Sequence, residues 1–96
     1  MIEFHQLARS ELREAVLWYR ERSPAVAERF VDQVNHAVER IEHDPESHPV
    51  IGRNHRYVRV SRFPYLLVFR MTDTDAVLIT AVAHTSRRSG YWRHRQ

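Results

Sequence analysis

The spacing of apolar residues predicts a short strand followed by two amphipathic helices. Residues 1–5 alternate apolar and polar side chains, as in a strand with one buried face. From Leu7 to Tyr19 the apolar residues instead recur every three or four positions, which places them on one face of a helix. A second stripe of the same kind runs from Ala27 to Ile41.

Ser23 and Pro24 separate the two predicted helices. The Ser23 hydroxyl can accept a hydrogen bond from the first turn of the second helix, and Pro24 suits the first position of that helix. The second helix is expected to end near Asp44, because the residue before a proline avoids the helical region. Two helices joined by about two residues form an αα-hairpin.

Three strands are predicted in the second half of the chain, at about 55–61, 65–72 and 76–83, after a loop at 45–54. A short polar turn joins the last two strands into a hairpin. The last strand is almost entirely apolar, so we expect it near the centre of the sheet. Residues 1–96 are thus predicted to form one α+β domain of order β-α-α-β-β-β. Its N-terminal strand and αα-hairpin are expected to pack on an antiparallel sheet.

The composition excludes several kinds of chemistry. The chain has no cysteine, which rules out disulfides, zinc–thiolate sites and cysteine nucleophiles. Its seven histidines form no metal-binding motif, and neither a phosphate-binding glycine loop nor a Gly-x-Ser-x-Gly motif occurs. We therefore expect no metal and no cofactor. No apolar run approaches the ~20 residues that span a bilayer, which predicts a cytoplasmic protein without membrane contact.

Charge is divided unevenly between the two halves of the chain. Residues 53–96 contain nine arginines and two aspartates, a net charge of +7, whereas residues 1–52 carry six arginines and ten acidic residues, a net charge of −4. The second half is therefore expected to attract an anionic partner, either nucleic acid or an acidic protein segment. On the helices, acidic residues alternate with arginines, as at Glu11, Arg13 and Glu14, and we interpret them as solvated faces.

A basic, aromatic tail follows the last strand. His84, at the strand end, can either bond the nearby backbone or donate a hydrogen bond to a phosphate group. Arg87 and Arg88 can bind phosphate or stay solvated. Tyr91 and Trp92 can stack on bases, but packing of the tail onto the domain is the favoured role of Trp92.

Taken together, these features resemble the RelE/ParE superfamily, the toxins of bacterial type II toxin–antitoxin modules. The resemblance covers about residues 3–93. It rests on the αα-hairpin, on Arg62-Phe63-Pro64-Tyr65 before the apolar hairpin, and on Val82-Ala83-His84-x-Ser86-Arg87-Arg88-x-Gly90-Tyr91-Trp92. It implies two N-terminal helices packed on an antiparallel sheet. It also implies a cognate antitoxin that wraps and neutralises the toxin, with operator DNA contacted only through that antitoxin.

The superfamily has two main activities. RelE-like members cut mRNA in the ribosomal A site without a metal, using basic side chains for acid–base and electrostatic catalysis. ParE-like members bind DNA gyrase and trap it on cleaved DNA, with no hydrolytic chemistry of their own. A third alternative is a member without toxicity that acts only with its antitoxin on operator DNA.

The nuclease pattern is incomplete in this chain. Two lysine positions of RelE-like nucleases hold Tyr57 and Arg59 here, and a nearby arginine position holds Leu66. Arg87 and Tyr91 match the arginine after the last strand and the C-terminal tyrosine. Arginine stays protonated at neutral pH and is a poor general base, although a histidine can take that role.

We therefore expect a ParE-like toxin that inhibits growth by binding DNA gyrase. The residues expected to contact the target or a nucleic acid are Arg59, Arg62, His84, Arg87, Arg88, Tyr91 and Trp92. The alternative is a RelE-like endonuclease that acts on the ribosome and mRNA. For that alternative the resemblance implies catalytic roles for Arg59, His84, Arg87 and Tyr91.

Overall fold

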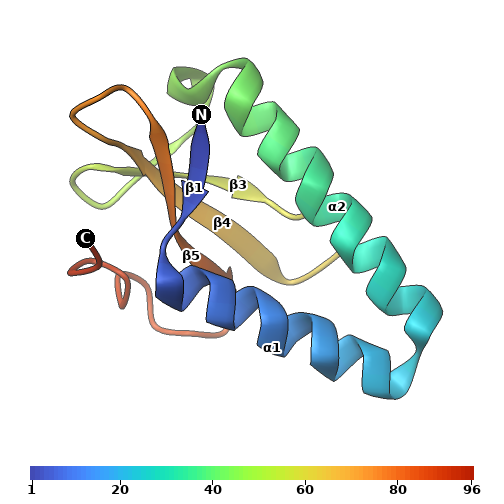
Figure 1. The fold of residues 1–96 in the computed structure, drawn as a ribbon. Coiled ribbons are helices and arrows are strands. Elements are labelled where there is room, and N and C mark those ends of the chain that lie inside the picture. Colours follow the sequence, from blue (N-terminus) through green and yellow to red (C-terminus); the bar gives the residue numbers. More distant parts are fainter.

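Two helices lie across one face of a five-stranded sheet in a computed structural model that describes residues 1–96 (Figure 1). The elements are β1 (Ile2–Phe4), α1 (Gln6–Arg22), α2 (Pro24–His43), a 3-10 helix (Pro45–Ser47), β2 (Val50–Ile51), β3 (His55–Arg59), β4 (Tyr65–Met71) and β5 (Val77–His84). The strand order in the sheet is β1-β5-β4-β3-β2. The α+β class, the αα-hairpin and the inner position of β5 are confirmed.

The sheet is mixed, where the sequence predicted an antiparallel one. Strands β2 to β5 are antiparallel to their neighbours, but β1 runs parallel to β5, with Ile2 opposite Val77 and Phe4 opposite Ile79. A parallel neighbour needs a long connection, which the helices and the other strands provide. Alternating hydropathy over a few residues predicts a strand but carries no information about its direction.

The strand limits also differ in detail from the prediction. The predicted loop at 45–54 contains the 3-10 helix and the short strand β2, which pairs with β3. Strand β3 ends at Arg59 because the chain turns there, and the Val60 N–H donates to the carbonyl of Tyr65 at 2.9 Å. Two residues of β2 are too few to show a hydropathy period.

The helix ends follow the predicted capping. The Ser23 N–H donates to the Tyr19 carbonyl at 2.8 Å and closes α1, while its hydroxyl accepts from the Val26 N–H at 3.3 Å and caps α2. His5 caps α1 in the same way, since its Nδ1 accepts from the Leu7 N–H at 3.0 Å. Neither helix is long and apolar enough to cross a bilayer.

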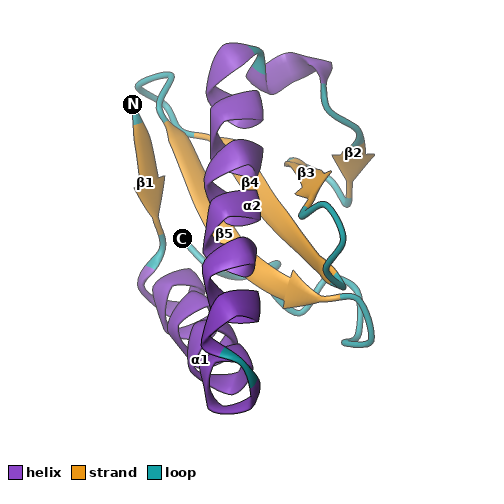
Figure 2. Ribbon diagram, turned by 90° about the vertical axis from the view of Figure 1, so that its right-hand side faces the viewer, coloured by secondary structure: helices purple, strands orange, loops and turns teal.

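Both faces of the sheet are covered by other parts of the chain. The helices cover one face, as Figure 2 shows for α2, and the main core between them is built around Phe30, Ile41, Leu67 and Phe69, all fully buried. On the other face the C-terminal tail packs Trp92 against a smaller cluster that includes Val68, Ala81 and Ala83. Trp92 is only 4% exposed, so its ring packs the tail onto the domain.

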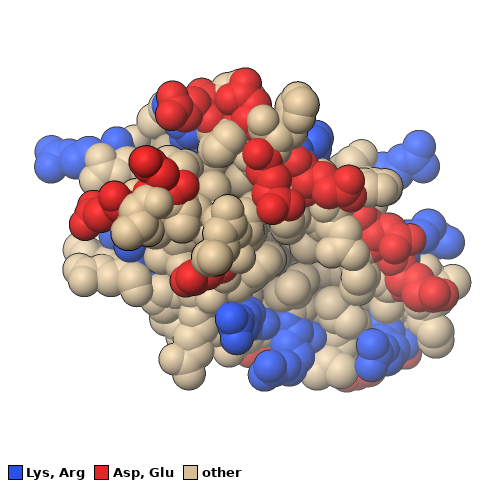
Figure 3. All heavy atoms as spheres, turned by 45° about the horizontal axis from the view of Figure 1, so that its top comes forward, with Lys and Arg blue, Asp and Glu red and all other residues tan.

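Carboxylates and arginines are separated on the surface. On the face seen in Figure 3, acidic side chains form a band, and arginines lie below it and at its margins. Helix α2 and the turn after it contribute six acidic residues, which are Glu28, Asp32, Glu39, Glu42, Asp44 and Glu46, and the end of α1 adds Glu21. The helical layer is thus the acidic side of the molecule.

Candidate functional site

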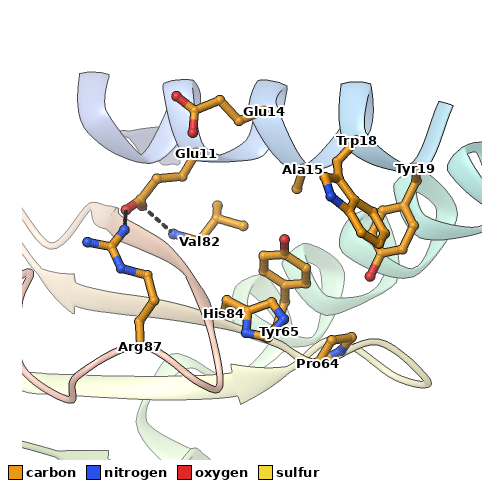
Figure 4. Close-up of a pocket in the computed structure, with 10 residues that line it drawn as sticks. All are labelled: Glu11, Glu14, Ala15, Trp18, Tyr19, Pro64, Tyr65, Val82, His84 and Arg87. Carbon is orange, nitrogen blue, oxygen red and sulfur yellow. Dashed lines mark hydrogen bonds and ion pairs between the residues drawn. The ribbon is translucent and has the colours of Figure 1, made fainter. Parts of the chain in front are cut away.

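A hollow of about 410 Å³ lies between α1 and the ends of β4 and β5 (Figure 4). We call it the α1 groove. Its lining residues are Glu11, Glu14, Ala15, Trp18, Tyr19, Pro64, Tyr65, Val82, His84 and Arg87. One wall is therefore a face of the first helix, and the other is formed by the paired strand ends.

Helical spacing builds the first wall of the α1 groove. Glu11, Ala15 and Trp18 lie three or four positions apart and point to the same side of α1. Ala15 is 4% exposed, and its small side chain lets the helix approach the sheet. Trp18 is 50% exposed, and the Arg22 guanidinium lies 3.6 Å from its ring centre. An exposed tryptophan held in place by a cation is a ready contact for a partner.

Strand pairing builds the second wall. The β4–β5 register sets Tyr65 opposite His84, and their rings meet edge-on with centroids 5.1 Å apart. Tyr19 from α1 closes the inner end of the groove against Phe30 and Tyr65. Burial raises the pKa of both Tyr19 and Tyr65, and nearby Tyr19 and Glu14 raise that of Tyr65 further. Both hydroxyls therefore stay protonated and can donate to a ligand.

Strand β5 has an open edge beside this groove. Strand β1 pairs only with residues 77–79, so the rest of β5 has no strand on that side. Side chains bond the exposed backbone instead: Glu11 Oε1 accepts from the Val82 N–H at 3.0 Å, and Arg95 donates to the Thr80 carbonyl at 2.9 Å. A strand edge without a neighbouring strand can accept an extended peptide, which here would replace the side-chain hydrogen bonds from Glu11 and Arg95.

Glu11 is the centre of a polar cluster that joins α1 to the tail. Arg95 donates to both of its carboxylate oxygens, at 2.8 and 3.0 Å, and the Tyr91 hydroxyl donates at 2.8 Å. Arg87 adds a longer ion pair of 3.5 Å. The Glu11 side chain is only 13% exposed. Our interpretation of Glu11 as part of a solvated helix face is therefore wrong, because its partners lie more than 70 positions further along the chain.

Tyr91 cannot act as a proton acceptor in this cluster. Burial raises its pKa, and so does its hydrogen bond to the Glu11 carboxylate, which stabilises the protonated hydroxyl. The Arg87 guanidinium lies 3.8 Å from the Tyr91 ring centre and is held between this ring and Glu11. Both residues, which were candidate contacts, therefore have partners inside the molecule.

His84 is held at the end of β5. Its Nδ1 accepts from the Ser86 N–H at 3.1 Å and from the Ser86 hydroxyl at 2.8 Å. A backbone N–H can only donate, so these contacts assign the neutral ring proton to Nε2. His84 therefore makes the backbone contact that was one of its two expected roles, while its ring remains in the wall of the groove.

The other sequence-predicted residues lie apart from this groove. Arg59 is exposed on β3, which β4 separates from β5, and Arg62 is exposed in the turn before β4 with a φ of 70°. Arg88 is exposed in the tail, whereas Trp92 is buried and has no free face for a base or a partner. The structure thus brings His84, Arg87 and Tyr91 to the region of α1 and leaves the other four elsewhere.

Two lining residues, Trp18 and Glu14, were not predicted from the sequence, and only Trp18 could have been. Trp18 lies off the apolar stripe of α1, and an exposed tryptophan on a charged helix indicates a contact site for a partner. Glu14 gave no such signal, since it resembles any other helix-surface carboxylate. No group of three or more His, Asp or Glu side chains is arranged to hold a metal ion.

Two helices packed on this mixed sheet, beside the open edge of a central strand, have the architecture of RelE/ParE superfamily toxins. A family model described as "ParE toxin of type II toxin-antitoxin system, parDE" matches residues 2–89. The chain therefore belongs to the ParE toxin family. No curated protein matches it closely enough to count as a relative.

Stability is expected to fall in mild acid because of His55, which is 7% exposed on β3. Burial and the nearby Arg70 guanidinium lower the pKa of His55 below its ordinary value of 6.5. Below pH 6.5 His55 takes up a proton in the unfolded chain but not in the folded protein, so acid favours unfolding. The free energy of unfolding therefore falls with pH until the folded-state pKa of His55 is reached. Between about pH 8 and about pH 5, the thermal unfolding temperature should fall less in His55→Gln than in the wild type. His43→Gln, at an exposed helix end, is the control; equal pH profiles for both variants would contradict the assignment.

Proposed function

We propose that this chain is a growth-inhibiting toxin that binds DNA gyrase and is neutralised by a cognate antitoxin seated in the α1 groove. The observation that carries the antitoxin part is the groove itself. It combines an exposed tryptophan, two tyrosines and the open edge of β5, a set that suits a peptide adding alongside the strand. The gyrase part is supported by membership of the ParE toxin family. Operator DNA would be contacted through the antitoxin.

The side-chain geometry supports binding more than mRNA cleavage. Of the four residues that a nuclease would use, Tyr91 and Arg87 are engaged with Glu11. Arg59 lies two strands away from His84. A catalytic set needs its groups within hydrogen-bond reach of one reacting phosphate. The exposed residues Arg59, Arg62 and Arg88 are better suited to contact a protein target.

The target can be tested by adding the purified chain to a gyrase reaction and to a gyrase-free translation system. We expect supercoiling to stop and cleaved DNA to accumulate, while protein synthesis continues and the mRNA stays intact. Cleavage of mRNA at codon positions, with gyrase unaffected, would assign the chain to the RelE-like alternative. Growth that is unchanged when the chain is expressed without its antitoxin would instead indicate a member without toxicity.

Tyr91→Phe removes one hydroxyl group and so tests whether that hydroxyl takes part in mRNA cleavage or only in a structural hydrogen bond. The variant loses the hydroxyl that donates to Glu11 at 2.8 Å and keeps the ring on which Arg87 lies. We expect it to lose about 1.5–3 kcal/mol of stability, as for a hydrogen bond to a charged group, and to keep gyrase inhibition. A fall of activity by orders of magnitude in a folded variant would instead show that the hydroxyl takes part in chemistry.

A further inference from the structure

A second surface lies away from the α1 groove, where the β2–β3 turn meets the C-terminal tail. Two hollows of about 520 and 530 Å³ adjoin there and share Asn54, His55 and Arg93. Five arginines line them, namely Arg53, Arg56, Arg70, Arg93 and Arg95, against the single acidic side chain of Asp73. We call these two hollows together the arginine groove.

Four of these arginines have no carboxylate partner. The two ion pairs of the structure are both made by Glu11, with Arg87 and Arg95. Asp73 lines the arginine groove and forms no ion pair there. Guanidinium groups gathered without counter-charges produce a strong positive potential, and a bound anion relieves their mutual repulsion.

The Arg93 guanidinium lies against the turn at Gly90. Gly90 has a φ of 86°, and a Cβ built on it would lie 2.5 Å from a terminal guanidinium nitrogen of Arg93. The missing side chain thus lets the guanidinium lie against the turn. Arg56 is ordered by a hydrogen bond, since it donates to the His48 carbonyl at 2.7 Å. A cation that is already ordered binds an anion at a lower entropic cost.

His55 lies where the two hollows meet. It is 7% exposed, and its Nε2 is the one buried side-chain nitrogen or oxygen in the structure without a hydrogen-bond partner. Leaving such a group unpaired costs stability, so a bound group that hydrogen-bonds to it would be favoured over the empty groove.

We propose that the arginine groove binds the sugar–phosphate backbone of a nucleic acid. Guanidinium forks match phosphate oxygens, and two adjoining hollows suit successive phosphates of one strand. An acidic peptide fits less well, because two of the four apolar lining residues, Phe69 and Trp92, are buried, and only Ile51 and Met71 are partly exposed for a peptide side chain to pack against. The groove shares no lining residue with the α1 groove, although Arg95 pairs with Glu11, and the family match ends at residue 89, before Arg93.

The test is fluorescence anisotropy of the purified chain with labelled duplex DNA of about 20 base pairs, over a series of salt concentrations. Single-stranded DNA and RNA of the same length tell which nucleic acid is preferred. The test variant is Arg53→Ala/Arg93→Ala, in which both side chains are exposed and carry no ion pair. The matched control is Arg13→Ala/Arg29→Ala, which removes the same charge from the exposed surface of the helices.

We expect the test variant to bind about 10- to 100-fold more weakly at low salt, with a salt slope smaller by about 2. The control variant should stay within about twofold of the wild type, and both should keep the wild-type unfolding temperature. Arg70→Gln should weaken binding as well. A wild-type chain that binds no nucleic acid, or two double variants that weaken equally, would overturn the proposal. Polyglutamate binding of equal strength that depends on Arg53 and Arg93 would also overturn it, in favour of an acidic protein.

The result is separable from the proposed target. If the wild-type chain inhibits gyrase but binds no nucleic acid, the proposal for the arginine groove is overturned and the gyrase proposal stands. If the chain binds nucleic acid through Arg53 and Arg93 but leaves gyrase unaffected, the arginine-groove proposal stands and the gyrase proposal is overturned.

Discussion

Glu11→Gln should lower the free energy of unfolding by about 3–5 kcal/mol, the usual loss when one partner of a buried ion pair is removed. The amide has the same shape but no charge, so Arg95, whose side chain is 13% exposed, would remain buried without a counter-charge. One of the two acceptor oxygens would also become an NH2 donor, so the groups that donate to that oxygen, either Tyr91 and Arg87 or the Val82 N–H, would lose their acceptor. Chemical denaturation of both proteins measures the difference directly.

Glu14→Gln is the control for that measurement. Glu14 lies on the same helix and lines the same groove, yet it forms no ion pair, so its replacement should change stability by about 0.5 kcal/mol or less. The double variant Glu11→Gln/Arg95→Met should recover much of the loss, because it leaves neither charge of this pair buried. Equal stability of Glu11→Gln and Glu14→Gln would show that the cluster around Glu11 contributes nothing to folding.

Glu11→Gln should also loosen the tail. Residues 85–96 are tied to α1 mainly through Arg95, Tyr91 and Arg87, and Trp92 packs beneath them. Faster amide exchange or proteolysis confined to the tail would show that this segment opens separately from the core. Release of the tail would also free the Thr80 carbonyl at the edge of β5, to which Arg95 donates.

Trp18→Ala should weaken antitoxin binding by about 30-fold or more, a loss of at least about 2 kcal/mol. Trp18 is half exposed in the wall of the α1 groove, and buried aromatic anchors dominate the energetics of protein interfaces. Because half of its surface is free in the unbound toxin, the substitution should alter stability far less than it alters affinity. Calorimetric titration of the purified toxin with its antitoxin gives the dissociation constants.

Leu17→Ala is the matched control for this second experiment. Leu17 adjoins Trp18, is 45% exposed and does not line the groove, so its truncation should change the affinity by no more than about threefold. If the two variants bound equally well, the antitoxin would have to sit elsewhere on the toxin. The gyrase proposal would be unaffected by that result.

Under the two proposals, the grooves serve as distinct surfaces for distinct partners. The α1 groove is aromatic and adjoins an open strand edge, whereas the arginine groove is polar and cationic. A toxin built in this way could keep its nucleic-acid contact while the antitoxin occupies the other surface. Anisotropy measurements with and without the antitoxin would show whether the two are bound independently.

The sequence by itself determined the features that depend on neighbours within about four residues. The apolar stripes predicted both helices, and the double role of Ser23 was visible beside Pro24. The continuous apolar run of β5 predicted its inner place in the sheet. Helix capping and hydrophobic periodicity are local effects, so they can be read from a short stretch of chain.

Only the tertiary structure decided which distant residues meet. Glu11 and Arg95 lie 84 positions apart, and each resembles an ordinary surface residue until the end of β1 leaves an edge of β5 for them to cover. The parallel pairing of β1 with β5 and the gathering of arginines around His55 have the same origin. Strand order sets these contacts, and strand order follows from how the whole set of apolar faces is buried together. For that reason the scaffold could be predicted from local pattern, whereas both grooves required the folded chain.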